Sequence, residues 1–142
     1  MKSKIWNNKG TSVVEMAIVL PLLLLLIFGV IEFGVFLYNQ AVITNASREG
    51  ARAGIVQALS RPTESDIQGV VTNYAQQYVI NLGGASVFVD GNTAAPDAPC
   101  TAFGEDLTVT VTYHYDFLVL PNFVSSLVGG VNLNAVTIMR CE

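Results

Sequence analysis

The chain is poor in charge and in the residues that most often carry out catalysis. Charged residues occupy only 13% of its 142 positions, against about a quarter in a typical soluble domain, while hydrophobic residues make up 51%. It has one histidine, His114, two cysteines, Cys100 and Cys141, and no glycine-rich phosphate loop. A histidine-based triad therefore lacks a supporting motif, and these residues form no metal motif. We predict that the protein is not an enzyme and has no cofactor and no metal site.

Basic residues are also scarce beyond the N-terminal third. After residue 38 there are four arginines against nine acidic residues, so this part of the chain is acidic. Binding to phosphates needs a basic patch, and we therefore predict no nucleic-acid partner.

The N-terminal third holds a long apolar run. Every residue from Met16 to Ile31 is apolar, Gly or Pro, and apolar character resumes after Glu32, from Phe33 to Tyr38. As a helix these 23 positions rise about 34 Å, enough to cross a hydrocarbon core of roughly 30 Å. A secretory signal peptide has a shorter apolar region that ends at a small-residue cleavage site, which is missing here. We predict a retained membrane anchor over about residues 16–38.

Charges beside this run predict its orientation. Lys2, Lys4 and Lys9 precede it without an acidic residue, which favours a cytoplasmic N-terminus. We therefore predict a single-pass protein of the inner (cytoplasmic) membrane whose C-terminal part is exported to the periplasm or beyond. Both cysteines lie in that part, where a disulfide persists. A Cys100–Cys141 disulfide is the favoured interpretation, and free buried thiols are the alternative.

One long helix is predicted from Thr11 to about Leu59, after a basic leader at residues 1–10, because proline does not follow the membrane run until Pro62. In its second half Ala46, Gly50 and Gly54 recur every four positions and share one face. Small residues allow a neighbouring backbone to approach closely. That neighbour is either the chain's own sheet or another subunit.

A second helix is predicted to begin after Thr63, with Asp66 at the capping-box position. Gly83-Gly84 is expected to end it. Its apolar positions follow helical spacing. They are Ile67, Val70, Val71, Tyr74, Ala75, Tyr78, Val79 and Leu82.

The remainder has β character. We expect a strand at Ser86–Asp90 ending in an Asp90-Gly91 turn, a long strand at 107–115 in which apolar residues alternate with threonines, and a third at about Leu133–Cys141. The apolar stretch 117–128 is either a loop against the core or a binding surface. The predicted fold is α+β: a long transmembrane helix that continues into an exported domain, residues 60–142, with one further helix and a three-stranded antiparallel sheet.

Glu15 stands at the start of the apolar run, where an unpaired charge in a bilayer costs several kcal/mol. Glu15 lies five positions after Gly10, with basic residues before Gly10 and apolar residues after Glu15. This arrangement resembles the type IV pilin superfamily. The resemblance implies that a prepilin peptidase cuts after Gly10, that Thr11 becomes the N-terminus, and that Glu15 pairs with the terminal amine of an adjacent subunit.

Further stretches resemble the TadE-like family of the tight-adherence (Flp, type IVc) pilus system. They are Glu15–Ala17, Leu20–Leu23, Glu32–Gly34, Ala46–Arg52, Val109–Tyr113 and Met139–Glu142. This resemblance implies a minor pilin or pseudopilin that works with the prepilin peptidase, other minor pilins, the major pilin and the inner-membrane assembly platform. A larger filament subunit, or an adhesin-like module at a pilus tip that uses the Asp90–Glu105 loop, is the alternative.

Two other charged features have open interpretations. Glu32 lies about 26 Å of helical rise beyond Glu15, either as an interfacial residue at the far membrane face or as a contact to another subunit's helix. Arg48, Glu49 and Arg52 form either a solvated or self-paired helix face or a partner contact.

Overall fold

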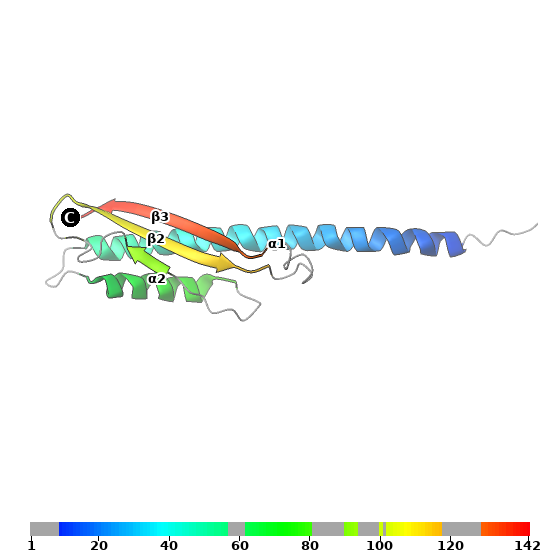
Figure 1. Ribbon diagram of the computed structural model, residues 1–142, viewed down its shortest axis with the longest axis horizontal. Coiled ribbons are helices and arrows are strands. Elements are labelled where there is room, and N and C mark those ends of the chain that lie inside the picture. Colours follow the sequence, from blue (N-terminus) through cyan, green and yellow to red (C-terminus); the bar gives the residue numbers. More distant parts are fainter. Residues whose placement is uncertain (1–8, 57–61, 81–89, 94–99, 101, 118–128) are drawn as a thin grey trace, which may run out of the picture.

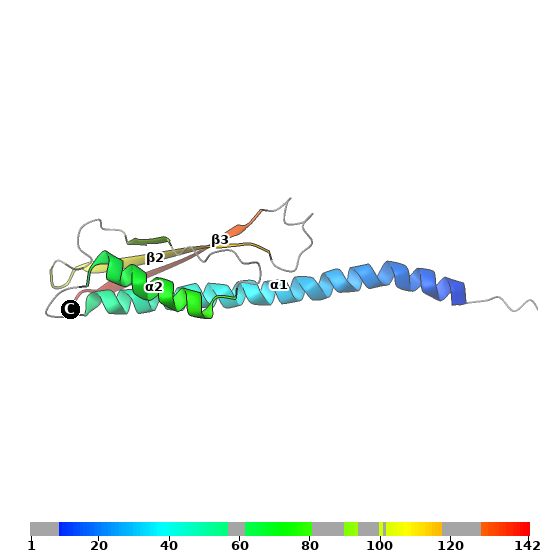
Figure 2. The same ribbon diagram turned by 90° about the horizontal axis from the view of Figure 1, so that it is seen from below.

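The computed structural model describes residues 9–56, 62–80, 90–93, 100, 102–117 and 129–142. A single helix, α1 (Lys9–Ile55), runs through both parts of the molecule. Its 47 residues correspond to about 70 Å of helical rise. The N-terminal half projects alone, whereas the C-terminal half lies against the rest of the chain, and the C-terminus lies at the end remote from the projecting half (Figures 1 and 2).

The helix begins two residues before the predicted start at Thr11. Lys9 and Gly10 are already helical, because a single glycine costs a helix only about 1 kcal/mol and does not stop it. Residues 57–61, which include the predicted end at Leu59, lie outside the described residues.

The second helix, α2 (Glu64–Tyr78), starts as the sequence predicts. The Thr63 hydroxyl accepts a hydrogen bond from the Asp66 N–H, and the Asp66 carboxylate accepts one from the Thr63 N–H, so the capping box is complete. Ile67, Val71 and Ala75 form its buried stripe.

The end of α2 differs from the prediction. The chain becomes extended at Val79 rather than continuing to Gly83-Gly84. The reason is a tie to α1: the Asn39 side chain donates to the Ile80 carbonyl and accepts from the Ile80 N–H, each at 3.0 Å. This pair replaces the helical partners that Ile80 would otherwise need. Leu82, Gly83 and Gly84 lie outside the described residues.

The strands β2 (Asp106–Tyr115) and β3 (Val131–Arg140) form a long antiparallel pair in which Val111 lies opposite Ala135. Alternation in β2 follows the prediction, with its apolar positions buried beneath a half-buried row of threonines. The third predicted strand begins slightly earlier than expected, at Val131.

A short strand, β1 (Asp90–Thr93), pairs with the other edge of β2. Asp90 and Gly91 therefore lie in a strand, and the prediction that they form a turn is wrong. Backbone pairing to Thr112 and Val111 holds them extended. The rest of the predicted strand Ser86–Asp90 lies outside the described residues, so a three-stranded sheet built on it stays a prediction.

The core lies between the C-terminal half of α1, α2 and the inner face of the sheet. Polar ties fix α1 to β3: Gln40 donates to the Asn134 carbonyl at 3.1 Å, and the hydroxyls of Ser47 and Thr137 lie 2.7 Å apart. The α+β class, with a long apolar helix, a second helix and antiparallel strands, is thus confirmed.

Candidate functional site

The N-terminal half of α1 has no cover within the described chain. Residues 10–31, here called the bare segment, are exposed except for the half-buried Gly29. The helix is long and apolar enough to cross a membrane. The 22 residues of the bare segment correspond to about 33 Å of helix, close to the roughly 30 Å of a hydrocarbon core.

The residues of the predicted processing site lie at the free end of this segment. Gly10, Thr11 and Glu15 are all exposed. A Cβ added at Gly10 would meet no atom within 4 Å, so the described chain leaves the Gly10–Thr11 junction open to approach. Thr11 and Glu15, four positions apart, share one helix face.

The bare segment ends where Glu32 meets the sheet. Glu32 is only 4% exposed, and the Tyr115 hydroxyl donates to its carboxylate at 2.5 Å. Burial, and then the hydrogen bond to Glu32, raise the pKa of Tyr115, which therefore stays a neutral donor. The structure therefore adds a third interpretation to the two from the sequence: Glu32 binds Tyr115 of its own chain.

Because the domain covers α1 from Glu32 onward, the predicted span at residues 16–38 overlaps the domain. Its last part includes Glu32, Val35 and Phe36, which pack against the core or lie buried. The part of α1 that is free to meet lipid on all sides ends at Ile31.

Aromatic rings gather at this junction. Phe36 packs edge-on against Tyr115 with ring centroids 5.6 Å apart, and Tyr115 packs edge-on against Phe117 at 5.9 Å. Beside them lies an open pocket of about 350 Å³. It is lined by Gly29, Glu32, Phe33, Phe36 and Phe117.

The small residues of α1 serve the chain's own packing. Ala46 is fully buried. A Cβ at Gly50 would lie 2.3 Å from Val71 Cγ2, and one at Gly54 would lie 2.5 Å from Leu107 Cδ2. Of the two alternatives that the sequence left open, the structure therefore shows the packing against α2 and β2 of the same chain.

Arg48, Glu49 and Arg52 lie on the opposite, exposed side of α1. Within the described part of the chain no ion pair joins them, so the structure does not support a self-paired face. A solvated face and a contact to a partner both remain as interpretations.

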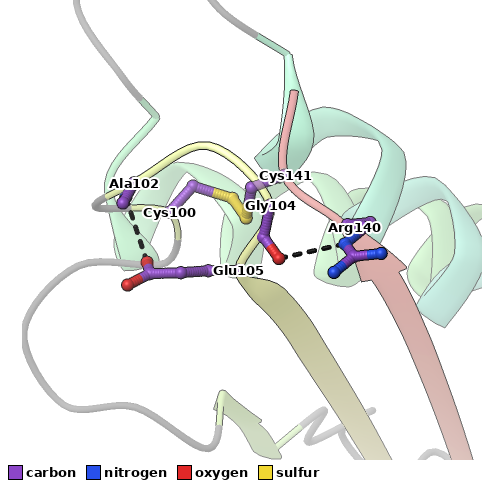
Figure 3. The surroundings of a disulfide bond; sticks show 6 residues. All are labelled: Cys100, Ala102, Gly104, Glu105, Arg140 and Cys141. Atoms are coloured by element: carbon purple, nitrogen blue, oxygen red, sulfur yellow. Dashed lines mark hydrogen bonds between the residues drawn. A yellow bond between two sulfur atoms is a disulfide. The ribbon is translucent and has the colours of Figure 1, made fainter.

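The far end of the domain is closed by a disulfide between Cys100 and Cys141, whose Cα atoms are 5.8 Å apart (Figure 3). It braces the turn 102–105, in which Gly104 has a φ of +87°. The Gly104 N–H donates to the Cys141 carbonyl at 3.0 Å, and Arg140 Nε donates to the Gly104 carbonyl at 3.0 Å. Phe103, on this turn, is 85% exposed.

His114 lies on the exposed face of β2, as its place in the strand predicts. Its Nδ1 lies 2.6 Å from Asn132 Oδ1 and its Nε2 lies 3.4 Å from the Asp116 carboxylate. Among the described residues there is no group of three or more metal-ligating side chains.

Sequence reasoning missed the junction. Tyr115 was expected only as a core residue of its strand, and Asn39 not at all. The available signal was a pair of polar residues, Glu32 and Asn39, seven positions apart on the same face of α1. The helix is otherwise apolar from Met16 to Asn39, so polar side chains on this face indicate that a polar group covers it.

The comparison with protein families agrees with this arrangement. Residues 10–52 match the family model described as TadE-like protein, which confirms the predicted resemblance over the bare segment and most of the covered part of α1. The stretches 109–113 and 139–142, for which the sequence analysis predicts the same resemblance, lie outside the matched residues. Neither the curated proteins nor the solved structures contain a match to this chain.

Proposed function

We propose that this protein is a minor pilin or pseudopilin of a tight-adherence (Flp, type IVc) pilus system. The observation that carries the proposal is the bare segment: an apolar helix of about 33 Å with Gly10 and Glu15 at its free end, within a stretch that matches the TadE-like family. A helix that the chain itself leaves uncovered needs an apolar environment, supplied first by the bilayer and later by neighbouring subunits.

In this proposal the bare segment crosses the inner membrane with its N-terminus in the cytoplasm. The domain is then exported, where an oxidising compartment maintains the Cys100–Cys141 disulfide. The prepilin peptidase cuts after Gly10 at the cytoplasmic face, where the junction is unobstructed by the described residues.

Cleavage makes Thr11 the first residue and Glu15 the fifth. In an assembly the Glu15 carboxylate pairs with the Thr11 amine of an adjacent subunit. Pairing offsets the several kcal/mol that each isolated charge costs in apolar surroundings. The partners are the major pilin, other minor pilins and the assembly platform, and the role is priming, incorporation or capping. No catalytic step is needed for any of these.

Intact-mass analysis tests the processing step. Coexpressed with its peptidase, the protein should lose residues 1–10, and Gly10→Ala should retain them. If the leader were kept in the wild type, and Gly10→Ala made no difference, the pilin proposal would fail.

Glu15→Gln tests the pairing step. We expect normal cleavage but impaired recovery in sheared pili. Asp106→Asn, which neutralises an exposed carboxylate at the start of β2, is the matched control and should be incorporated normally. Equal incorporation of Glu15→Gln and the wild type would argue against charge pairing.

A second candidate function is display of an adhesin-like binding module at a pilus tip. Phe103 favours it, because an aromatic side chain that is 85% exposed on a disulfide-braced turn is placed for contact with a partner. A deletion strain with normal pili but lost adhesion would support display, whereas loss of pili would support assembly.

A further inference from the structure

The pocket at the junction is walled by side chains from two distant parts of the chain. Phe36 from α1 and Phe117, which follows β2, are held in place by the Tyr115 ring between them. Glu32 is the one charged residue in the lining; the residue is 4% exposed, and its carboxylate accepts a hydrogen bond from the Tyr115 hydroxyl. What the opening presents is therefore apolar surface.

The height of the pocket along α1 corresponds to a membrane boundary. Gly29 belongs to the bare segment, and Phe33 and Phe36 follow it by one and two turns. Since the bare segment spans about 33 Å from Gly10, a bilayer whose hydrocarbon core covers it ends at the level of the pocket.

Side chains on the outside of α1 remain uncharged past this level. Between Met16 and Ser47 the only charged residue is Glu32, and it points inward to the sheet. Phe33, Leu37 and Tyr38 are exposed instead, a cluster of the aromatic and apolar side chains that favour the membrane interface.

We propose that this pocket takes an acyl chain of a phospholipid from the exported-side leaflet, so that the membrane-facing end of the domain rests in the lipid. The inference relies on the proposed function only in treating the bare segment as a membrane span. A helix of a second copy is the competing occupant, but it becomes available only on assembly, whereas lipid surrounds the bare segment from membrane insertion onward. An acyl chain enters as a single file of methylenes.

Single-tryptophan reporters test this in the full-length protein in phospholipid vesicles. The one native tryptophan is removed by Trp6→Phe, and Leu22→Trp, Phe117→Trp and Val136→Trp are made separately in that background. Leu22 lies in the bare segment, Phe117 in the pocket wall, and Val136 on the exposed face of β3. Phe33→Trp reports on the pocket from the α1 side if Phe117→Trp does not fold.

Vesicles with brominated acyl chains should quench Leu22→Trp and Phe117→Trp differently. Leu22→Trp should lose most fluorescence with bromine near the methyl end of the chain, and Phe117→Trp with bromine near the glycerol end. Val136→Trp should respond to aqueous iodide only.

Two outcomes overturn the inference while leaving the anchor intact. In both, Leu22→Trp is quenched by bromine, but Phe117→Trp is quenched by iodide alone or is shielded from both quenchers. Quenching of Phe117→Trp that falls as the protein-to-lipid ratio rises would assign the pocket to a second copy instead. A Leu22→Trp signal that bromine does not affect would contradict the membrane span itself, and with it the proposed function.

Discussion

The two halves of α1 use the same secondary structure for opposite purposes. In the bare segment large apolar side chains point outward and glycines have open space around them, as at Gly10 and Gly29. In the covered half α1 contributes large side chains such as Ile43 to the core, and glycines mark the places where side chains of α2 and the sheet come closest, as at Gly50 and Gly54. One continuous helix thus passes between two environments without a break in its backbone, and side-chain size decides which environment each half accepts.

Loss of the disulfide should produce the largest difference in stability between the two halves of α1. Replacing Cys100 and Cys141 together by serine opens a crosslink across 41 positions, which lowers the free energy of unfolding of the domain by about 4 kcal/mol. Urea unfolding in detergent, followed by near-ultraviolet circular dichroism, measures this loss. The helical signal of the bare segment, measured by far-ultraviolet circular dichroism, should survive. Its simultaneous loss would contradict the division into two halves.

Glycine substitutions should be costly in one half and harmless in the other. Gly50→Ala places a methyl group 2.3 Å from Val71 Cγ2 and should lower the free energy of unfolding by about 3 kcal/mol. Gly29→Ala is the matched control in the bare segment, where no atom lies within 4 Å, and it should change stability by less than about 1 kcal/mol, in the stabilising direction. Thermal unfolding in the same detergent compares them, and equal shifts would refute the contrast.

Tyr115→Phe probes the boundary between the halves. It removes the hydroxyl that donates to buried Glu32 and keeps the ring contacts, so the free energy of unfolding should fall by about 2 kcal/mol. Tyr78→Phe, at an exposed tyrosine of α2, should leave the unfolding midpoint unchanged. Similar midpoints for the two variants would mean that the Glu32 bond does not hold the domain against α1.

The smallest effect is expected at the capping box of α2. Hydrogen bonds from the Thr63 side chain and backbone lower the pKa of Asp66. A lowered folded-state pKa means that the carboxylate stabilises the fold at pH values above its unfolded pKa, and that this contribution is lost as pH falls through the folded pKa. Unfolding midpoints between neutral and acidic pH should therefore fall slightly more for the wild type than for Asp66→Asn. Parallel pH profiles would exclude the contribution.

The elements with a regular pattern were predictable from sequence. The stripe of Ile67, Val71 and Ala75 repeats at helical spacing, and the alternation in β2 leaves one face apolar, so local periodicity is sufficient for both. The Gly10 to Glu15 spacing was equally readable because it lies within six residues.

The junction was not predictable in the same way. Tyr115 and Glu32 are 83 positions apart, and Asn39 and Ile80 are 41 apart, so no local pattern links them. The end of α2 and the point at which the domain begins to cover α1 both depend on these long-range bonds. These two boundaries could therefore be identified only from the folded structure.

The parallel course of the strands and α1 also has a mechanical consequence. The strands β2 and β3 run lengthwise beside the covered half of α1, and the C-terminus lies at the remote end (Figures 1 and 2). Tension applied between the bare segment and that remote end therefore acts along the interface, in shear, and loads the Gln40 and Ser47 ties and the surrounding side-chain contacts together. Contacts loaded together resist a pull better than contacts opened one after another, so the domain should yield to force applied across the sheet before it yields to force along the helix.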